Sequence, residues 1–397
     1  MTNKYYLSSV SDFDFLANNV EVDASNVLFL KNIDCHSINS KYRIIRYDKT
    51  FLNHESAKNI GLCRSVVLNN FNNVIGFSPP KSIDADAFMN KYPVLKNNII
   101  AEEYIEGTMI NVFYDKSVGI WELSTKNTVG ANTRFFSIEN GKTFREMFWE
   151  AADYCGLDIN KLNKDFSYSF VLQHPENRIV IPIHVPYLYL VAVYNMYKED
   201  NSTVVISFHS HEFKMYSTYL TKETRVGFQQ IYEFGSYADL IEKYASNNTP
   251  YTIMGVVMHN IETGERTKIR NPVYEKVRQL RGNQPKLQYH YLCLRKENKV
   301  KEYLEYYPEH IAIFTLYRDA VHTFTNELYD NYVACYICKS KPLIEYSVKY
   351  RTHMYNLHHI FLDKLKENKQ KINIYLVQTY VNEMHPSLLM HCLNHET

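Results

Sequence analysis

Tyr104-Ile105-Glu106-Gly107-Thr108 is the stretch that decides the fold of this chain, because five other short motifs flank it in a fixed order. These are Arg64-Ser65-Val66-Val67 upstream, and then Ser124-Thr125-Lys126, the FVLQHPENRIV segment from Phe170 to Val180, Gly255-Val256-Val257 and Thr267-Lys268-Ile269-Arg270. Each motif alone is short enough to occur by chance, whereas the ordered set is specific. The set therefore predicts one domain that contains all of these motifs.

The residues around these motifs alternate between β-rich runs and turn signals up to about Val273. We expect strands at 64–68, 109–114, 187–194, 204–209 and 252–258, and helices at 143–154 and 236–244. This pattern predicts an α+β fold with a mostly antiparallel sheet.

After about Tyr274 the pattern becomes helical and stays helical. Apolar residues at three- and four-residue spacing predict helices at 300–306, 311–329, 348–366 and 374–384, and prolines separate them. We therefore expect two domains. The first covers residues 1–275, with 1–58 as a candidate N-terminal extension, and the second is an all-helical domain over residues 276–397.

From about residue 60 to residue 275, the motif order and the PENRIV segment resemble the adenylyltransferase domain of ATP-dependent RNA ligases. The resemblance is to the phage T4 RNA ligase 1 type, within the covalent nucleotidyltransferase superfamily. It implies a nucleotidyltransferase domain of ATP-grasp-like ligase fold with antiparallel sheets, followed by an all-helical C-terminal domain. A degenerate copy of this kind looks like the proteins that large DNA viruses encode.

In the family that the motifs resemble, a lysine amine attacks the α-phosphorus of ATP or GTP and forms a phosphoramidate. Here Tyr104 stands at the position of that lysine, and a phenol with a pKa near ~10 has no evident activator beside it. Val171 and Met254 replace glutamates of the family, and their side chains bind neither metal nor ribose. Gly107 is retained, and the resemblance implies that it lets the loop approach the nucleotide closely. The full set of positions in these degenerate motifs is Tyr104, Glu106 (for an aspartate), the retained Gly107, Val171, Met254 and Arg270 (for a lysine).

Several basic residues match basic positions of the family and could form a pocket for a phosphate, a nucleotide or an RNA backbone. They are Arg64, Lys81, Lys126, Lys268 and Arg270. The alternative is that they are ordinary surface cations, because charges near strand ends usually just solvate a face. Tyr104 and Met254 are also large enough to occupy space that a nucleotide would use.

One set of cysteines and histidines has the spacing of a zinc finger. It consists of Cys335, Cys338, His353 and His358, in the order C-x2-C-x14-H-x4-H. The segment has a helical pattern, and histidines five residues apart point away from each other on one helix. We therefore expect no metal site there. Lys198-Glu199-Asp200 is similar to the lost nucleophile motif, but Asn201 replaces its glycine, and we interpret it as a solvated hairpin.

The joint losses predict a catalytically inactive RNA-ligase-like protein that binds RNA or a nucleotide, or that is a structural component of a viral assembly with protein partners. The alternative is a divergent active RNA ligase that joins 5′-phosphate and 3′-hydroxyl RNA ends, with Lys126 or Lys81 as the nucleophile. A variant of this alternative seals pre-adenylylated RNA. We expect no cofactor under the first hypothesis, and ATP with Mg²⁺ only under the alternative.

The bulk composition bears on where the protein is located more than on its function. There are 44 basic and 43 acidic residues, so no global field drives the chain onto nucleic acid. The seven cysteines are scattered, and no apolar run approaches the ~20 residues of a membrane span. The first ten residues, MTNKYYLSSV, lack the features of a signal peptide. We therefore expect no membrane span, and a cytoplasmic or virion-associated protein that is not secreted.

Overall fold

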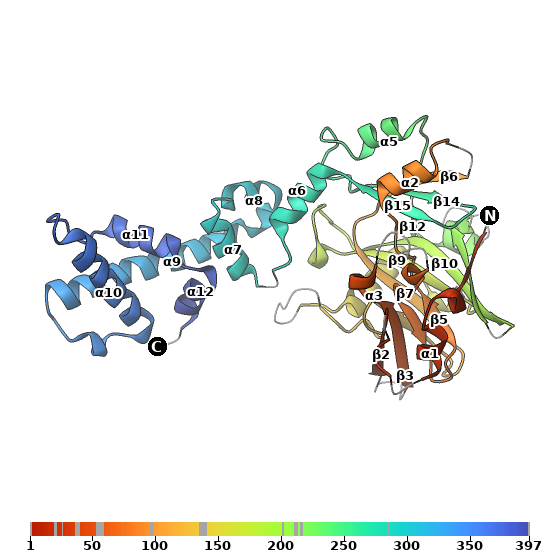
Figure 1. Ribbon diagram of the computed structural model, residues 1–397, viewed down its shortest axis with the longest axis horizontal. Coiled ribbons are helices and arrows are strands. Elements are labelled where there is room, and N and C mark those ends of the chain that lie inside the picture. The colour runs from red at the N-terminus through yellow and green to blue at the C-terminus, as the bar shows by residue number, and fades with distance from the viewer. Residues whose placement is uncertain are drawn as a thin grey trace. The chain divides into compact units, whose positions relative to one another are not determined.

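The computed structural model describes residues 2–19, 22–25, 27–35, 40–52, 59–95, 98–134, 141–200, 202–209, 213–214, 217–284 and 286–395. Residue contacts divide the chain into two units, with the division between Gln279 and Leu280. The first unit contains the sheets and the second is helical (Figure 1). Within the described residues, no helix is both long enough and apolar enough to cross a membrane.

The first unit contains three sheets. The large sheet has the order β1 (Thr2–Tyr6), β11 (Ser202–His209), β10 (Tyr187–Glu199), β9 (Phe166–Gln173), β7 (Thr108–Asp115) and β8 (Ile120–Ser124), and β12 (Gly227–Phe228) pairs with β10. The small sheet has the order β13 (Ile231–Tyr232), β6 (Ile99–Glu103), β14 (Gly255–Asn260) and β15 (Arg266–Arg270). The N-terminal sheet consists of β2 (Leu28–Cys35), β3 (Ser40–Tyr47), β4 (Val66–Leu68) and β5 (Val74–Phe77), and α1 (Phe13–Asn18) precedes it in the chain. Among the described strand pairs of these sheets, only β10 with β12 is parallel.

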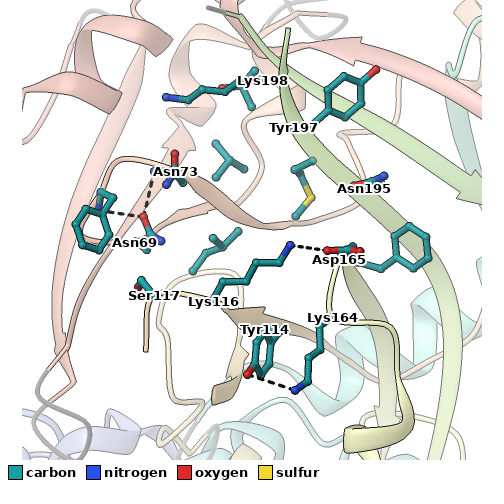
Figure 2. Close-up of a pocket in the computed structure, with 16 residues that line it drawn as sticks. Asn69, Asn73, Tyr114, Lys116, Ser117, Lys164, Asp165, Asn195, Tyr197 and Lys198 are labelled. Carbon is teal, nitrogen blue, oxygen red and sulfur yellow. Dashed lines mark hydrogen bonds and ion pairs between the residues drawn. The ribbon is translucent and has the colours of Figure 1, made fainter. Parts of the chain in front are cut away.

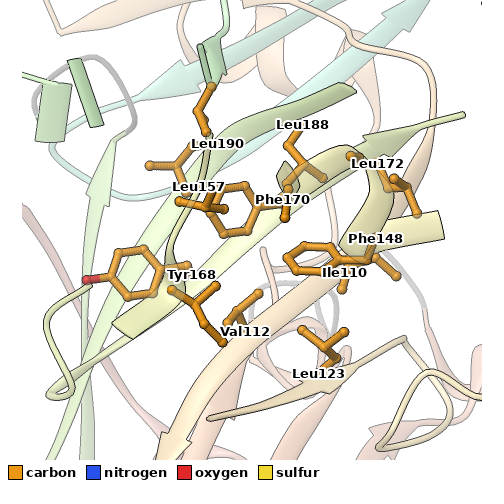
Figure 3. Packing of buried hydrophobic residues seen from close by; sticks show 14 of the residues in the cluster. Ile110, Val112, Leu123, Phe148, Leu157, Tyr168, Phe170, Leu172, Leu188 and Leu190 are labelled. Atoms are coloured by element: carbon orange, nitrogen blue, oxygen red, sulfur yellow. The ribbon is translucent and has the colours of Figure 1, made fainter. Parts of the chain in front are cut away.

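One face of the large sheet packs on α3 (Phe144–Cys155) and forms the main core of the unit (Figure 3). Ile110, Phe170 and Leu190 lie on this face and are fully buried. Because side chains alternate along a strand, their neighbours Met109 and Val171 lie on the opposite face, directly across from each other in the register. That opposite face lines the candidate site. The helix begins at a capping box formed by Thr143 and Glu146, and it ends at Gly156.

The small sheet shows the same division of faces. Ala101, Val256 and Met258 face a hydrophobic cluster that includes residues of α2 (Ala85–Lys91) and α5 (Tyr237–Tyr244), which lie beside this sheet in Figure 1. The alternate residues point the other way. Glu102, Val257 and Lys268 form one cross-strand row on that second face. The row places charged side chains where they can meet the apolar Val171 face of the large sheet.

The second unit is helical, and the 3.6-residue pattern predicted its helices between residues 300 and 384 but not those at 287–296 and 386–394. After α6 (Pro272–Arg281) come α7 (Leu287–Lys296), α8 (Val300–Tyr306), α9 (Ile311–Tyr332), α10 (Val348–Ile360), α11 (Ile374–Glu383) and α12 (Pro386–Asn394). On α9, the buried residues Phe314, Val321, Phe324 and Leu328 fall on one face at helical spacing. The predicted helix at 348–366 ends as an α-helix at Ile360 and continues as a π-helical turn.

The α+β architecture with mostly antiparallel sheets followed by helices is confirmed. The strand at 187–194 was predicted too short, because it continues to Glu199 as one half of a long hairpin. The strand at 252–258 was predicted to begin too early, since pairing starts only at Gly255. Asp200 adopts a left-handed conformation at the end of the hairpin, so the prediction of a hairpin at Lys198-Glu199-Asp200 is confirmed.

Candidate anion-binding site

A pocket of about 240 Å³ is lined by residues of the large and the small sheet. It brings together the degenerate motif positions and three of the predicted basic residues, which lie far apart in the sequence. These residues are Arg64, Tyr104, Glu106, Gly107, Val171, Met254, Lys268 and Arg270. Tyr104 and Met254 line the pocket without filling it. The pocket is nevertheless smaller than the ~300–1,000 Å³ that is typical of sites for whole small-molecule ligands.

Tyr104 stands directly after β6, and two basic residues flank its side chain. The Nζ of Lys268 donates to the Tyr104 hydroxyl at 3.2 Å, and the Nη2 of Arg270 does so at 3.4 Å. The Lys268 Nζ also lies 4.7 Å from the centre of the Tyr104 ring, within the range of a cation–π contact. The backbone N–H of Tyr104 donates to the carbonyl of Gly255 at 3.3 Å, which ties the residue to the start of β14. The phenol is therefore held in place by the basic groups that a phosphate would otherwise attract.

Lys268 is the lysine of this pocket, and its environment disfavours the charged amine. Burial, together with the nearby cations Arg266, Arg64 and Arg270, lowers its pKa to about 6. At neutral pH this shift favours the uncharged amine over the ammonium form. An anion that entered the pocket would reverse this balance, because it would favour the ammonium form.

Arg266 is a member of this cluster that the sequence analysis missed. Its side chain lines the pocket, and its Nε has no hydrogen-bond partner among the described residues. Burial lowers the pKa of its guanidinium, and Arg64 adds to that effect. The signal was present in the sequence, since Arg266, Lys268 and Arg270 are two residues apart and therefore share one face of β15.

Three of the pocket cations lack an acidic partner. Within the described part of the chain, Arg64, Arg266 and Lys268 have no carboxylate within ion-pair distance, and Arg64 Nη1 donates only to the carbonyl of Pro79 at 3.5 Å. Buried cations without counter-charges are costly unless a ligand supplies the missing charge. The charge of the pocket therefore suits an anion.

Glu106 has a structural role at this site. Its carboxylate is 1% exposed and accepts hydrogen bonds from the backbone N–H groups of Val180 and Ile181 at 3.1 to 3.3 Å. Burial raises the pKa of Glu106, and these hydrogen bonds oppose the shift. Glu106 thus anchors the segment that follows Pro175-Glu176-Asn177, and its carboxylate oxygens are occupied by these backbone hydrogen bonds.

Gly107 is required by packing within the protein. Its φ is +152°, and a Cβ at this position would lie 2.5 Å from the carbonyl oxygen of Leu172 and 2.6 Å from a methyl group of Val171. The resemblance implied that glycine is needed here for the close approach of a nucleotide, whereas the structure shows that it is needed for packing against β9. The loop passes closely over β9, and only glycine leaves room for that approach.

The donors in the pocket do not fit a divalent metal ion. Val171 and Met254 offer no oxygen atom where the family has glutamates. The buried Glu102 is paired with His259 at 3.2 Å, and Glu275 is paired with two arginines of the pocket. Among the described residues, no group of three or more His, Cys, Asp or Glu side chains is arranged to hold a metal.

Two of the predicted basic residues lie outside the pocket. Lys81 lines a neighbouring hollow and donates to the carbonyl of Ser82 at 3.0 Å. The Nζ of Lys126 lies 5.2 Å from the ring centre of Tyr47. Burial lowers the pKa of both lysines, and Arg64 contributes to each shift, so they belong to the positive surroundings of the pocket but do not line it.

The zinc-finger residues do not converge in the structure. Cys335 lies in a π-helical turn and Cys338 is exposed. His353 is buried, with its ring nitrogens 2.8 Å from the Tyr380 hydroxyl and 3.2 Å from the Cys392 sulfur. The ring of His358 stacks on Tyr336, with the centres 3.9 Å apart. Each of these histidines is thus part of the packing of the helical unit.

Comparison with known proteins adds two sequence relatives. No protein-family model matches the chain. The chain is 31% identical over 100 residues to an RNA ligase of Rhodothermus phage RM378, which is 23% of this chain and 22% of the phage protein. It is 25% identical over 265 residues to the immediate-early protein ICP-46 homolog of Invertebrate iridescent virus 6, which is 62% of this chain and 55% of the viral protein. The chain therefore spans about a fifth and about half of these relatives.

Solved structures show only remote likeness. An RNA ligase of Naegleria gruberi in complex with ATP and manganese has a TM-score of 0.37 at 11% identity, covering 50% of this chain and 57% of that chain. A putative ATP-dependent DNA ligase from Aquifex aeolicus has a TM-score of 0.39 at 14% identity, covering 89% and 85%. The chain is similar in sequence to an RNA ligase of a phage over 100 residues and to an iridovirus protein over 265 residues.

Proposed function

We propose that this protein is a non-catalytic RNA-ligase-like protein that binds the terminal phosphate of an RNA strand in the pocket around Tyr104. The observation that carries the proposal is the position of Tyr104, whose hydroxyl receives hydrogen bonds from Lys268 and Arg270. The phenol replaces the nucleophile, while the surrounding cations persist. A protein with this pocket keeps the means to hold a phosphate but lacks the amine that would accept an adenylyl group at position 104.

The size and charge of the pocket favour a phosphate over a whole nucleotide. Its volume of about 240 Å³ lies below the range that is usual for drug-sized ligands. Arg64, Arg266 and Lys268 supply donors without carboxylate partners in the described chain. Val171 leaves no group to bind a ribose hydroxyl. Participation in a larger viral assembly is a further part of this proposal, and its support is the iridovirus relative.

The test compares two RNA oligonucleotides of one sequence, with and without a 5′-phosphate. We expect the phosphorylated strand to bind at least tenfold more tightly to the wild-type protein, and the preference to disappear in Arg64→Ala. Lys222→Ala serves as the matched control, because Lys222 is exposed and lies outside this pocket. Equal affinity of the two strands for the wild-type protein would rule out a terminal-phosphate site.

One observation favours a second candidate function, in which Lys268 is the nucleophile in place of residue 104. Its amine is mostly uncharged at neutral pH and lies 3.2 Å from the hydroxyl that replaces the family's lysine. In that reaction a bond forms between Nζ and the α-phosphorus of ATP, the bond to the pyrophosphate oxygen breaks, and the amine proton passes to solvent. The earlier candidates Lys81 and Lys126 lie outside the pocket, so they are weaker choices.

Intact-mass spectrometry separates the two candidates. The protein is incubated with ATP and Mg²⁺ or Mn²⁺, and phage T4 RNA ligase 1 serves as the positive control. The first proposal expects an unchanged mass, and no joining when pre-adenylylated RNA is supplied instead of ATP. A gain of one AMP that maps to Lys268 and is absent in Lys268→Arg would establish the second candidate and refute the first.

A further inference from the structure

A second pocket of about 610 Å³ lies elsewhere in the first unit and shares no lining residue with the pocket around Tyr104. Four separate segments build it: the turn after β4, the end of β7 with the following turn, the loop before β9, and the paired ends of β10 and β11 (Figure 2). Its volume lies within the ~300–1,000 Å³ that is typical of ligand sites. The ligase motifs contribute nothing to it.

The lining of this second pocket is positively charged. It contains Lys116, Lys164 and Lys198, and Asp165 is its one acidic residue among the described residues. Lys116 is paired with Asp165, but both side chains are more than half exposed, so the pair is weak and screened by salt. Lys198 is exposed at the end of the long hairpin. Two positive charges therefore remain for a ligand.

Aromatic rings lie beside these lysines. The Nζ of Lys164 lies 4.4 Å from the ring centre of Tyr114 and donates to its hydroxyl at 3.4 Å (Figure 2). Phe71 and Tyr197 also line the pocket, and they are 69% and 37% exposed. A phenylalanine that is mostly in water, within a pocket that also carries lysines, offers a flat apolar surface for a planar ligand.

The turn that carries Phe71 is fixed by its own hydrogen bonds. The side-chain oxygen of Asn69 accepts from the backbone N–H groups of Phe71 at 3.0 Å and Asn73 at 3.1 Å (Figure 2). Asn72 adopts a left-handed conformation within the same turn. The exposed ring is thus presented on a preorganised loop, which lowers the entropy that binding would cost. The amides of Asn73 and Asn195 also line the pocket and can donate to and accept from a base edge.

We propose that this second pocket binds a short segment of single-stranded nucleic acid, with backbone phosphates at Lys164 and Lys198 and a base stacked on Phe71. Lysines alone would describe a solvated surface. Here the pocket combines lysines that have no carboxylate partner among the described residues with an exposed ring on a fixed turn and with amide side chains in its lining. Single-stranded nucleic acids offer phosphates, π-faces and base edges together, and these groups match that combination. This site goes beyond the terminal-phosphate pocket and does not depend on it.

The test is a binding titration with fluorescent ten-nucleotide oligouridylate and oligothymidylate, both without a terminal phosphate. We expect the double variant Lys164→Ala/Lys198→Ala to bind at least tenfold more weakly than the wild type. Its salt dependence should be shallower by about 1.4 in the slope of log K against log salt, since each single-strand phosphate contact contributes about 0.7. Phe71→Ala should weaken binding about fivefold or more, as expected for the loss of one stacked base.

Two variants control for unspecific effects. Lys222→Ala removes an exposed lysine and Phe15→Ala an exposed ring, both outside the second pocket, and neither should change affinity. Equal affinity of the double variant and the wild type, or equal losses in the controls, would overturn the proposal. Failure of both oligonucleotides to bind would do so as well.

The outcome also separates this inference from the proposed function. Loss of affinity in the double variant but not in Lys268→Ala supports the second pocket, whatever the fate of the terminal-phosphate site. Loss only in Lys268→Ala would assign the strand to the pocket around Tyr104 and refute a second site. Crosslinking with 4-thiouridine should label a peptide that contains Phe71, and labelling confined to the peptide with Tyr104 would contradict the proposal.

Discussion

The Nζ of Lys268 lies 3.2 Å from the hydroxyl oxygen of Tyr104, so Lys268 contacts the tyrosine at the position where the family that the motifs resemble has a lysine. The same amine lies over the Tyr104 ring and is buried among other cations. This contact joins two motifs that are 164 residues apart in the sequence. The Tyr104 ring and hydroxyl also contact the guanidinium of Arg270, and they partly replace the missing anion beside this cation.

Restoration of the lysine alone should not restore adenylylation. In Tyr104→Lys the amine would return, but Val171 and Met254 would still supply no oxygen for a metal. We expect no AMP adduct in the single variant and a detectable adduct in Tyr104→Lys/Val171→Glu/Met254→Glu. Intact mass after incubation with ATP and Mg²⁺ measures both. Full adenylylation of the single variant would show that the lost carboxylates are dispensable.

Phosphate binding should depend on pH through Lys268. Because burial lowers the pKa of this amine to about 6, the free protein must take up a proton when a phosphate binds above that pH. We expect the affinity ratio of wild type to Lys268→Met to fall as the pH rises from 6 to 8. Calorimetry or fluorescence anisotropy with one phosphorylated oligonucleotide measures this ratio. Because both proteins bind the same oligonucleotide, the ionisation of its phosphate affects both affinities equally and cancels in the ratio. A ratio that is constant over this range would contradict proton uptake by Lys268.

Lys268 should also lower the free energy of unfolding, and this destabilising effect should decrease over a defined pH window. Its folded pKa lies near 6 while the unfolded value is near ~10.4, so between these values the unfolded chain binds the extra proton. The free energy of unfolding of the wild type should therefore rise relative to Lys268→Met as the pH increases from about 6 towards 10. Urea unfolding at several pH values measures the difference. In the exposed control Lys222→Met the difference should stay flat, and a flat difference for Lys268→Met would contradict the shift.

Gly107→Ala should destabilise the fold strongly. The added Cβ would lie 2.5 Å from the Leu172 carbonyl oxygen, and the φ of +152° is strained for alanine. We expect a loss of about 2–4 kcal/mol in the free energy of unfolding. Gly235→Ala is the matched control, because its Cβ would meet only a side-chain oxygen at 3.6 Å. Similar stabilities of the two variants would show that β9 can move away from the loop.

Part of this site could be predicted from the sequence. The directions of long side chains could not, because they depend on tertiary contacts. The motif order indicated a positively charged pocket formed by Arg64, Lys81, Lys126, Lys268 and Arg270, and in the structure three of these five residues line one pocket with Tyr104, Val171 and Met254. Lys81 matched the motif pattern equally well but donates to a neighbouring backbone carbonyl instead. A motif gives the position of a residue along the chain, whereas the direction of a long flexible side chain depends on its surroundings.

The groups that the sequence analysis missed are those whose role depends on neighbours from distant segments. The pairing of Glu102 with His259 requires the register between β6 and β14, and the second pocket requires four segments to meet. Arg266 was the exception, since the alternation along β15 pointed to it. Strand ends were also missed, because pairing partners decide where a strand stops.

The sequence by itself determined the class of fold, the succession of sheets and helices, and the absence of a lysine at position 104 and of glutamates at positions 171 and 254. These follow from periodicity and residue chemistry, which are local properties. Only the tertiary structure decided that Tyr104 is flanked by Lys268 and Arg270, that Glu106 anchors a loop, and that Gly107 is required by β9. Burial, and with it the low pKa of Lys268, is a property of the assembled core, because it depends on which distant groups exclude water and which charges they bring.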